Sequence, residues 1–420
     1  STKGVGSDAA EVRALAVDTI AKICKAAGAE QLQAHIPELV PAMLESLSQL
    51  EDQRLNYLEQ HAERYGVSAD RLESARVSAS KSTPMSDTLD LCARQCRPDT
   101  LEGLVPKLVA LIKRGVGLNT RCGTANFVAQ LSMRHGSDMR PHTGTLIKAL
   151  LAAARTDPSA AVRRSYASTA AQLARFASNS RAAKLLEEAA DVFRGADAGD
   201  RDSKVLAGTI VREMARHAPD VLSGNAAAVM PLAFLAKTDE DPDVAAVWKE
   251  VWEEGTSSEA AAVRLYMAEL LPIMTEGISS QQWGRKASAA RSIAAAAASS
   301  PDAVSPHARA LSEALMEELP GRLWDGKEAL LSALAALAKE CPGHVDEGRV
   351  LDALLAALMR KKSAFRGAAL EALEAAVSAF ASGEHFARVA PPLLDACLGS
   401  TAPAESSEAE APLPPAGALR

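Results

Sequence analysis

The sequence is poor in aromatic side chains, which make up 4% of its 420 residues. With so few large rings, we expect alanine and leucine to fill the core at close contacts between helices. No alternating Val/Ile/Thr run of strand length occurs, which argues against a β-sheet fold. No run of 18 apolar residues occurs either, so we expect no direct membrane insertion. The composition therefore predicts an all-α protein.

An excess of positive charge is also missing, because 46 Lys and Arg stand against 53 Asp and Glu, for a formal net charge of −7. Nucleic-acid binders show a basic patch or stripe, so we expect no nucleic-acid partner. The six cysteines include no Cys-x-x-Cys pair, and we see no signal peptide, which together favour a reduced intracellular compartment. The chain opens on Ser1 without a methionine, and we expect a longer parent protein.

Residues 101–135 predict two amphipathic helices joined by a tight turn, and neither helix can bury its apolar stripe without neighbours. In the turn, Gly115 suits a left-handed helix end, and Asn119 or Thr120 can cap the second helix. The two apolar faces consist of Leu104, Leu108, Leu111 and Ile112, and of Ala125, Val128, Ala129 and Leu131.

A basic residue recurs near the start of successive small-residue-rich helices, at steps of 42, 41, 82, 41 and 39 residues. These residues are Arg121, Arg163, Lys204, Lys286, Lys327 and Arg366. A period of about 41 residues with two helices per unit predicts a HEAT/ARM-type α-solenoid of antiparallel helix pairs. The bases either bridge to carboxylates inside the stack, which we favour, or line a docking surface.

We expect three parts in the chain. Residues 1–66 form less regular helices and a charged connector, residues 67–399 form the solenoid, and residues 400–420 form a disordered Pro/Ala/Glu-rich tail. The first helix should turn Val12, Leu15, Ile20 and Ile23 inward. An atypical repeat at about 220–277 carries two tryptophans on a helix that lacks the basic residue, and we expect this helix to depart from the period.

No motif supports catalysis, so we expect a protein that is not an enzyme and uses no cofactor. Ser78 and Lys81 match a short S-x-x-K pattern, but its companion motifs are missing. Cys92 and Cys96, one helical turn apart, could present metal ligands, but no companion completes a tetrahedron and core packing is favoured.

Two features of the sequence can be interpreted either as structural or as sites of partner contact. Trp248 and Trp252 either anchor a partner or cover a seam in the stack, and the seam is favoured. The acidic run at 239–243 is a solvated turn or a docking patch, and the turn is favoured.

Several irregular segments carry a more specific resemblance: Lys-Ser-Thr-Pro-Met at 81–85, Arg-Gly-Val-Gly at 114–117, Pro-Leu-Ala-Phe-Leu at 231–235 and Trp-Asp-Gly-Lys-Glu at 324–328. Over about residues 67–398, the chain resembles the C-terminal part of the large HEAT-repeat adaptor and scaffold family of the 26S proteasome. Generic alanine-rich repeats have no reason to share these segments.

The resemblance implies a non-catalytic adaptor that tethers the proteasome core to its regulatory particle, in assembly quality control and protein degradation, including degradation linked to the endoplasmic reticulum. It also implies motor and vesicle-trafficking partners, and a place in the cytoplasm and nucleus with peripheral sites at endoplasmic reticulum and endosomes. The alternative is a scaffold for another cargo, such as a nuclear-transport receptor or a phosphatase scaffold. The candidate partner-binding residues are Arg114, Arg121, Trp248, Trp252, Trp324 and Lys327.

Overall fold

The computed structural model describes residues 10–50, 69–80, 83–197, 199–380 and 383–399. Throughout these ranges every regular element is helical and no strand occurs, which confirms the all-α prediction. The helices form two compact units, residues 1–292 and 293–420, with the boundary inside one helix. Most of the predicted connector and the predicted tail lie outside the described residues.

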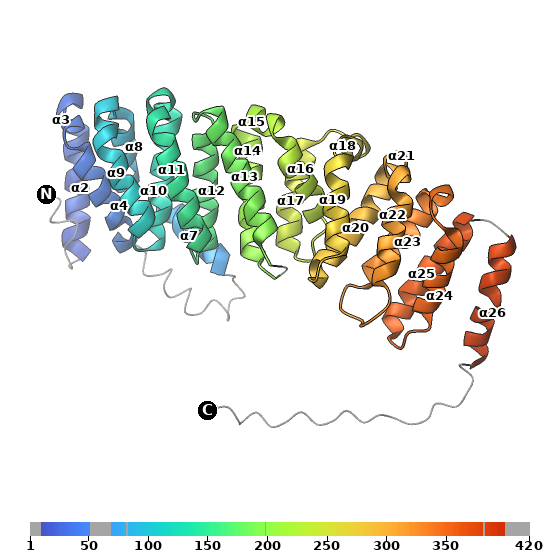
Figure 1. The fold of residues 1–420 in the computed structure, drawn as a ribbon. Coiled ribbons are helices and arrows are strands. Elements are labelled where there is room, and N and C mark those ends of the chain that lie inside the picture. Colours follow the sequence, from blue (N-terminus) through green and yellow to red (C-terminus); the bar gives the residue numbers. More distant parts are fainter. Residues whose placement is uncertain (1–9, 51–68, 81–82, 198, 381–382, 400–420) are drawn as a thin grey trace, which may run out of the picture. The chain divides into compact units, whose positions relative to one another are not determined.

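The first unit is built from helix pairs that follow one another along the chain (Figure 1). Its elements are α2 (Ala10–Ala26), α3 (Ala29–Gln33), α4 (Ile36–Ser46), η1 (Leu47–Leu50), α7 (Ala69–Ser80), α8 (Pro84–Gln95), α9 (Pro98–Arg114), α10 (Leu118–Arg134), α11 (Gly136–Thr156), α12 (Ala160–Ala174), α13 (Asn179–Gly195), α14 (Arg201–His217), α15 (Pro219–Gly224), α16 (Ala226–Ala236), α17 (Pro242–Gly255), α18 (Glu259–Leu265), α19 (Met267–Ile278) and the start of α20 (Trp283–Ser299).

The pairs form two layers in this unit. The first helices contact one another from α9 to α11 and from α13 to α16 and α19, while the second helices α10, α12, α14 and α17 pack in series. The second helices α10, α12, α14, α17 and α20 begin at steps of 42, 41, 41 and 41 residues, which confirms the period.

The tryptophan-bearing helix α17 keeps this spacing, so the predicted departure from the period was wrong. Its place is fixed by packing against α14 and by the side chain of Asp241, which accepts hydrogen bonds from the backbone N–H groups of Asp243 and Val244. Neither interaction needs the recurring basic residue. An N-cap carboxylate of this kind satisfies donors that the first helical turn leaves unpaired.

The predicted pair at 101–135 is α9 and α10, and both predicted apolar faces are buried. The turn between them differs from expectation. Gly117, at φ +90°, takes the left-handed conformation, while Gly115 stays at φ −59°. A side chain at Gly117 would also collide with the Ser48 side chain. Neither Asn119 nor Thr120 caps α10, because Gly117 is the N-cap and both residues lie inside the helix, where the Ser48 hydroxyl accepts from the Thr120 N–H at 3.0 Å.

The predicted inner face of the first helix was largely wrong. Ile20 is buried in α2, but Val12, Leu15 and Ile23 are 47%, 68% and 55% exposed. The helix carries apolar residues on two sides, and the side bearing Ile20 and Cys24 is the one buried in its contact with α8.

Helix α7 is not a member of either layer, because it packs on the second helices α10 and α12. Glu73 accepts hydrogen bonds from the Ser159 hydroxyl at 2.6 Å and from the Ala161 N–H at 3.4 Å, at the start of α12. Arg164 donates to the Ser74 hydroxyl at 3.4 Å. The outer surface of the second helices therefore already holds one helix of this chain.

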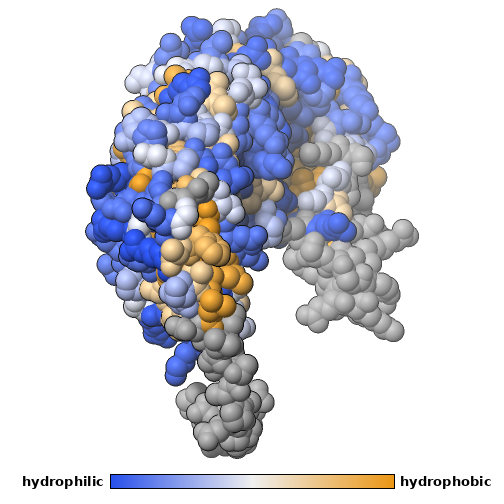
Figure 2. Space-filling view, turned by 90° about the vertical axis from the view of Figure 1, so that its right-hand side faces the viewer, coloured by the Kyte–Doolittle hydropathy of each residue, from blue (hydrophilic) through white to orange (hydrophobic). Residues whose placement is uncertain are grey.

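The second unit repeats the two-layer arrangement. It contains the end of α20, α21 (Pro301–Val304), η2 (Ser305–His307), α22 (Ala308–Glu318), α23 (Glu328–Glu340), η3 (Pro342–His344), α24 (Glu347–Leu358), α25 (Ser363–Phe380) and α26 (Gly383–Gly399). Helix α23 packs on α25, and α24 packs on α22, α25 and α26. Figure 2 shows hydrophobic surface gathered over α26, where Phe386 and Leu394 are 67% and 60% exposed.

Candidate partner-binding site

The first three recurring bases pair with carboxylates, and we call this series the ladder: Arg121–Asp157, Arg163–Asp202 and Lys204–Asp239. In the first rung, a guanidinium nitrogen of Arg121 contacts Asp157, whose side chain is only 6% exposed. Asp157 also accepts from the Ser159 N–H at 2.9 Å, which orders the turn before α12. Because the carboxylate is so little exposed, this rung is part of the packed stack.

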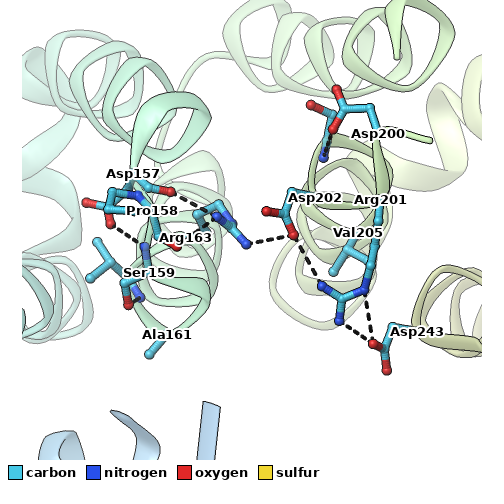
Figure 3. Close-up of polar contacts among 12 residues, drawn as sticks. Asp157, Pro158, Ser159, Ala161, Arg163, Asp200, Arg201, Asp202, Val205 and Asp243 are labelled. Carbon is cyan, nitrogen blue, oxygen red and sulfur yellow. Dashed lines mark hydrogen bonds and ion pairs between the residues drawn. The ribbon is translucent and has the colours of Figure 1, made fainter. Parts of the chain in front are cut away.

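The second rung joins two repeats through Arg163 (Figure 3). Its guanidinium Nη1 donates to the carbonyls of both Asp157 and Pro158, at 2.9 and 3.2 Å, and Nη2 lies 2.8 Å from the Asp202 carboxylate. Arg201 then continues the network from α14 to Asp243 in α17. These contacts link the turns that precede three successive second helices.

The third rung uses the acidic run at 239–243. The Lys204 ammonium lies 2.9 Å from Asp239, and both side chains are nearly buried, at 13% and 12% exposure. Glu240 pairs with Arg291, and Asp241 caps α17. The acidic residues are thus engaged within the chain, in agreement with a structural turn.

The later bases differ from one another. Lys286 is 9% exposed, and Lys327 is 1% exposed and donates to the carbonyls of Pro320 and Arg322 at 2.9 and 3.2 Å. Lys327 therefore anchors the irregular loop before α23. Arg366 is exposed near the start of α25.

The predicted tryptophan sites lie inside the stack. Trp248 is fully buried, donates from its indole N–H to the Lys204 carbonyl at 3.0 Å, and meets Phe193 edge-on at 5.0 Å. Trp252 is 3% exposed and Trp324 is 8% exposed. Trp248 and Trp252 cover seams between helices, and Trp324 is buried in the loop before α23, so little of any of these rings is accessible to a partner.

Arg114 has a different setting, since it is exposed at the end of α9 beside the turn whose tip, Val116, is 85% exposed. Among the predicted candidates it is the one with an accessible charged group. Its side chain remains a candidate for partner contact.

A groove of about 220 Å³ follows the outer surface of α12, α14 and α17. Its floor includes the buried side chains of Leu206, Thr209 and Val247. Its walls carry charges of both signs, including the second rung of the ladder: Arg163, Arg164, Arg201, Arg212, Asp202, Asp243 and Glu250. An apolar floor between charged walls suits an extended or helical polypeptide segment.

Sequence reasoning missed most of these wall residues. It followed one base per repeat, and Arg201 and Arg212 lie on the same helix as the ladder residue Lys204 but outside that register. A step of 41 residues from Arg201 leads to Pro242, which directly precedes Asp243. Applying the spacing to every charged residue would therefore have pointed to Arg201 and Asp243 as neighbours.

Cys92 lies in α8 and Cys96 directly follows it, and both side chains are buried. Burial raises the pKa of both the Cys92 and Cys96 thiols to about 12, so neither forms a thiolate near neutral pH. Among the described residues no group of three or more metal-binding side chains comes together. Ser78 is exposed on α7, and Lys81 lies outside the described residues.

None of the described helices has the length and apolar character of a membrane span.

The family model and the sequence relatives that match this chain all belong to one family. Residues 32–194 match the HEAT-repeat domain of the proteasome adapter and scaffold protein ECM29. The human protein of that name is 36% identical over 351 residues, covering 82% of this chain and 19% of the human protein. The Drosophila melanogaster proteasome-associated protein ECM29 homolog is 28% identical over 378 residues, covering 88% of this chain and 20% of the relative. The chain thus spans about a fifth of the length of these relatives.

Among solved structures, Kap121p bound to RanGTP aligns with a TM-score of 0.48 and 14% identity, over 96% of this chain and 40% of that chain. A likeness at this score and identity carries no argument about partners.

Proposed function

The sequence relates this chain to the ECM29 family of proteasome adapter and scaffold proteins, and from that premise we propose that it is a non-catalytic segment that binds the 26S proteasome. The observation that carries the proposal is the identity of 36% with the human relative across 82% of the chain. No relative named for another cargo favours the alternative of a transport receptor or a phosphatase scaffold.

Within this proposal, the groove on α12, α14 and α17 is the contact surface. Its wall charges pair with one another but stay partly exposed, as in Arg201–Asp243 at 42% and 60% exposure, whereas the Lys204–Asp239 rung is nearly buried. Helix α7 already packs on the second helices α10 and α12, next to the groove. This packing supports a polypeptide as the occupant of the groove. A binding partner would pair with Arg164 and Arg201 from outside the stack.

The finer parts of the function are proposed on the same basis. The chain contacts both core and regulatory-particle subunits and helps to hold them together. It acts in the cytoplasm and nucleus, and motor, endosomal and endoplasmic-reticulum partners reach the proteasome through the longer protein. Its lack of catalysis is supported by the names of the relatives, which are adapters, scaffolds and proteasome components.

Affinity purification of the tagged chain from cells, followed by quantitative mass spectrometry, tests the proposal. The parent chain is expected to recover core and regulatory subunits, and Arg164→Glu/Arg201→Glu is expected to lose most of them. The matched control is Lys148→Glu/Lys184→Glu, which reverses two exposed charges on the first helices α11 and α13. A folded parent chain that recovers no proteasome subunit contradicts the function, and equal recovery by both double variants contradicts the groove as its site.

A further inference from the structure

The second unit carries a concentrated cationic surface at the turn between α24 and α25, which we call the basic turn. It contains four cations and two exposed apolar side chains: Arg360, Lys361, Lys362, Arg366, Met359 and Leu370. No acidic residue occurs between Asp352 and Glu371. The basic turn therefore stands out from a chain whose formal net charge is −7.

The contacts within the protein neutralise only part of this charge. Lys362 lies 3.4 Å from Asp325 and 3.5 Å from Glu328, and these carboxylates raise the pKa of its ammonium. Arg360 donates to the carbonyl of Gly321, which carries no net charge. Two carboxylates thus face four cations, and both of them approach Lys362.

Arg366 holds the ladder position of its repeat, but its setting differs from that of the ladder in the first unit. Arg121 and Lys204 each pair with a carboxylate 36 or 35 residues further along the chain. Arg366 is exposed, and no carboxylate of the described residues forms an ion pair with it. The position that is engaged inside the stack elsewhere is directed to solvent here.

The local helix chemistry points the same way. Helix α25 has no acidic residue in its first turn, as is also true of α10, α12 and α20, but among these four helices α25 is the one whose recurring base is exposed. The N-terminal end of a helix carries partial positive charge, so Lys362 and Arg366 beside it are locally unfavourable. A sequence that breaks a local stability rule at an exposed position often does so for binding.

The apolar rim defines what kind of partner matches this charge. Met359 is 56% exposed beside Arg360, and Leu370 is 49% exposed one turn after Arg366. The aromatic residue of the segment, Phe365, is 1% exposed, so it offers no ring on which a base could stack. Cations flanked by aliphatic side chains suit carboxylates interspersed with apolar residues.

We propose that the basic turn binds an acidic polypeptide segment of a partner protein, with carboxylates on Lys361 and Arg366 and an apolar side chain against Met359 or Leu370. This interaction does not depend on proteasome binding. It would give the second unit a docking surface of its own, separate from the groove of the first unit.

Fluorescence anisotropy of a fluorescein-labelled peptide of repeated Glu-Glu-Leu units, titrated with the full chain, tests the proposal. Lys361→Glu/Arg366→Glu is expected to weaken binding by about tenfold or more, because two attractions become repulsions. The charge-preserving Lys361→Arg/Arg366→Lys variant is expected to bind like the parent. Raising the salt concentration from about 50 to about 200 mM should weaken parent binding, since exposed charges are screened.

The matched control is Arg309→Glu/Lys339→Glu, which reverses two charges with side chains 71% and 68% exposed. These residues lie at the start of α22 and the end of α23, away from the loop that joins those helices. Equal peptide affinity for this control and for the reversed basic turn would overturn the proposal.

Three further measurements distinguish among the possible occupants of the basic turn. Tighter binding of duplex DNA or of phosphatidylserine vesicles than of the peptide would overturn the assignment to a polypeptide. A large gain in peptide affinity on removal of residues 400–420 would overturn the assignment to a partner protein, because it would make the chain's own Glu-containing tail the occupant. Unchanged affinity on that removal supports a separate partner.

Discussion

The ladder of the first unit and the basic turn of the second unit come from the same sequence signal and have different roles. In the ladder, each base meets a carboxylate of the chain, and Lys204 and Asp239 are almost withdrawn from water. In the basic turn, Arg366 occupies the corresponding place and stays exposed. The comparison shows that a recurring base does not by itself identify a binding surface. A carboxylate holds Lys204, backbone carbonyls hold Lys327, and Arg366 stays exposed.

The difference also predicts where substitutions act. A buried ion pair is a poor source of net stability, but removal of one partner leaves an uncompensated charge. An exposed cation can be changed with little effect on folding. Substitutions in the ladder should therefore lower the free energy of unfolding, and substitutions in the basic turn should change the affinity for a partner.

The largest effect on stability is expected for Asp157→Ala. This substitution leaves Arg121 without its partner and the Ser159 N–H without its acceptor, at a cost of about 3 kcal/mol in the free energy of unfolding. Urea unfolding followed by circular dichroism measures this cost. Asp202→Ala removes a carboxylate that is 52% exposed and should cost much less, so equal costs would break the distinction between buried and exposed rungs.

A somewhat smaller cost, about 2 kcal/mol, is expected for Lys327→Ala. The substitution removes the donor from the Pro320 and Arg322 carbonyls and leaves a space where the side chain was buried. Thermal unfolding gives the stability change, and peptide binding at the basic turn gives the contrast. Lost binding with unchanged stability would place Lys327 on a contact surface and contradict its anchoring role.

A cost of at most about 1 kcal/mol is expected for Arg201→Ala, because its partner Asp243 is 60% exposed and exposed ion pairs contribute little. The same variant should reduce the recovery of proteasome subunits. A cost as large as that of Asp157→Ala would show that the groove wall is a structural rung rather than an accessible surface.

The smallest stability effect, within about 0.5 kcal/mol, is expected for Lys361→Glu/Arg366→Glu, whose side chains are exposed. Stabilisation is also consistent, since acidic residues suit the start of α25. A marked loss of stability in urea would show that the basic turn is part of the packing, and would remove its contrast with the ladder.

The sequence predicted the repeat well because the period and the apolar faces of α9 and α10 depend on residues close in the chain. It failed where a distant segment decides the outcome. Ser48, 72 residues away, hydrogen-bonds Thr120 where a local cap was expected. The contact with α8 selects one of two apolar sides of α2, and Val12 lies on the other.

The candidate site was harder to predict for the same reason. Periodicity identified Arg121 and Lys327 but could not tell whether their partners are carboxylates, backbone carbonyls or other proteins. For Trp248 the sequence favoured a seam but left an interface open, and its hydrogen bond to the Lys204 carbonyl places it inside the packing. Burial of charged and aromatic residues depends on packing between repeats, and spacing along one helix does not contain that information.

Amide hydrogen exchange of the full chain, with and without purified 26S proteasome, tests the central claim most directly. We expect the proteasome to slow exchange in α12, α14 and α17, around Arg164 and Arg201, and to leave the first helices α11 and α13 unchanged. Protection confined to α11 and α13, or no protection at a concentration that saturates a folded chain, would contradict it.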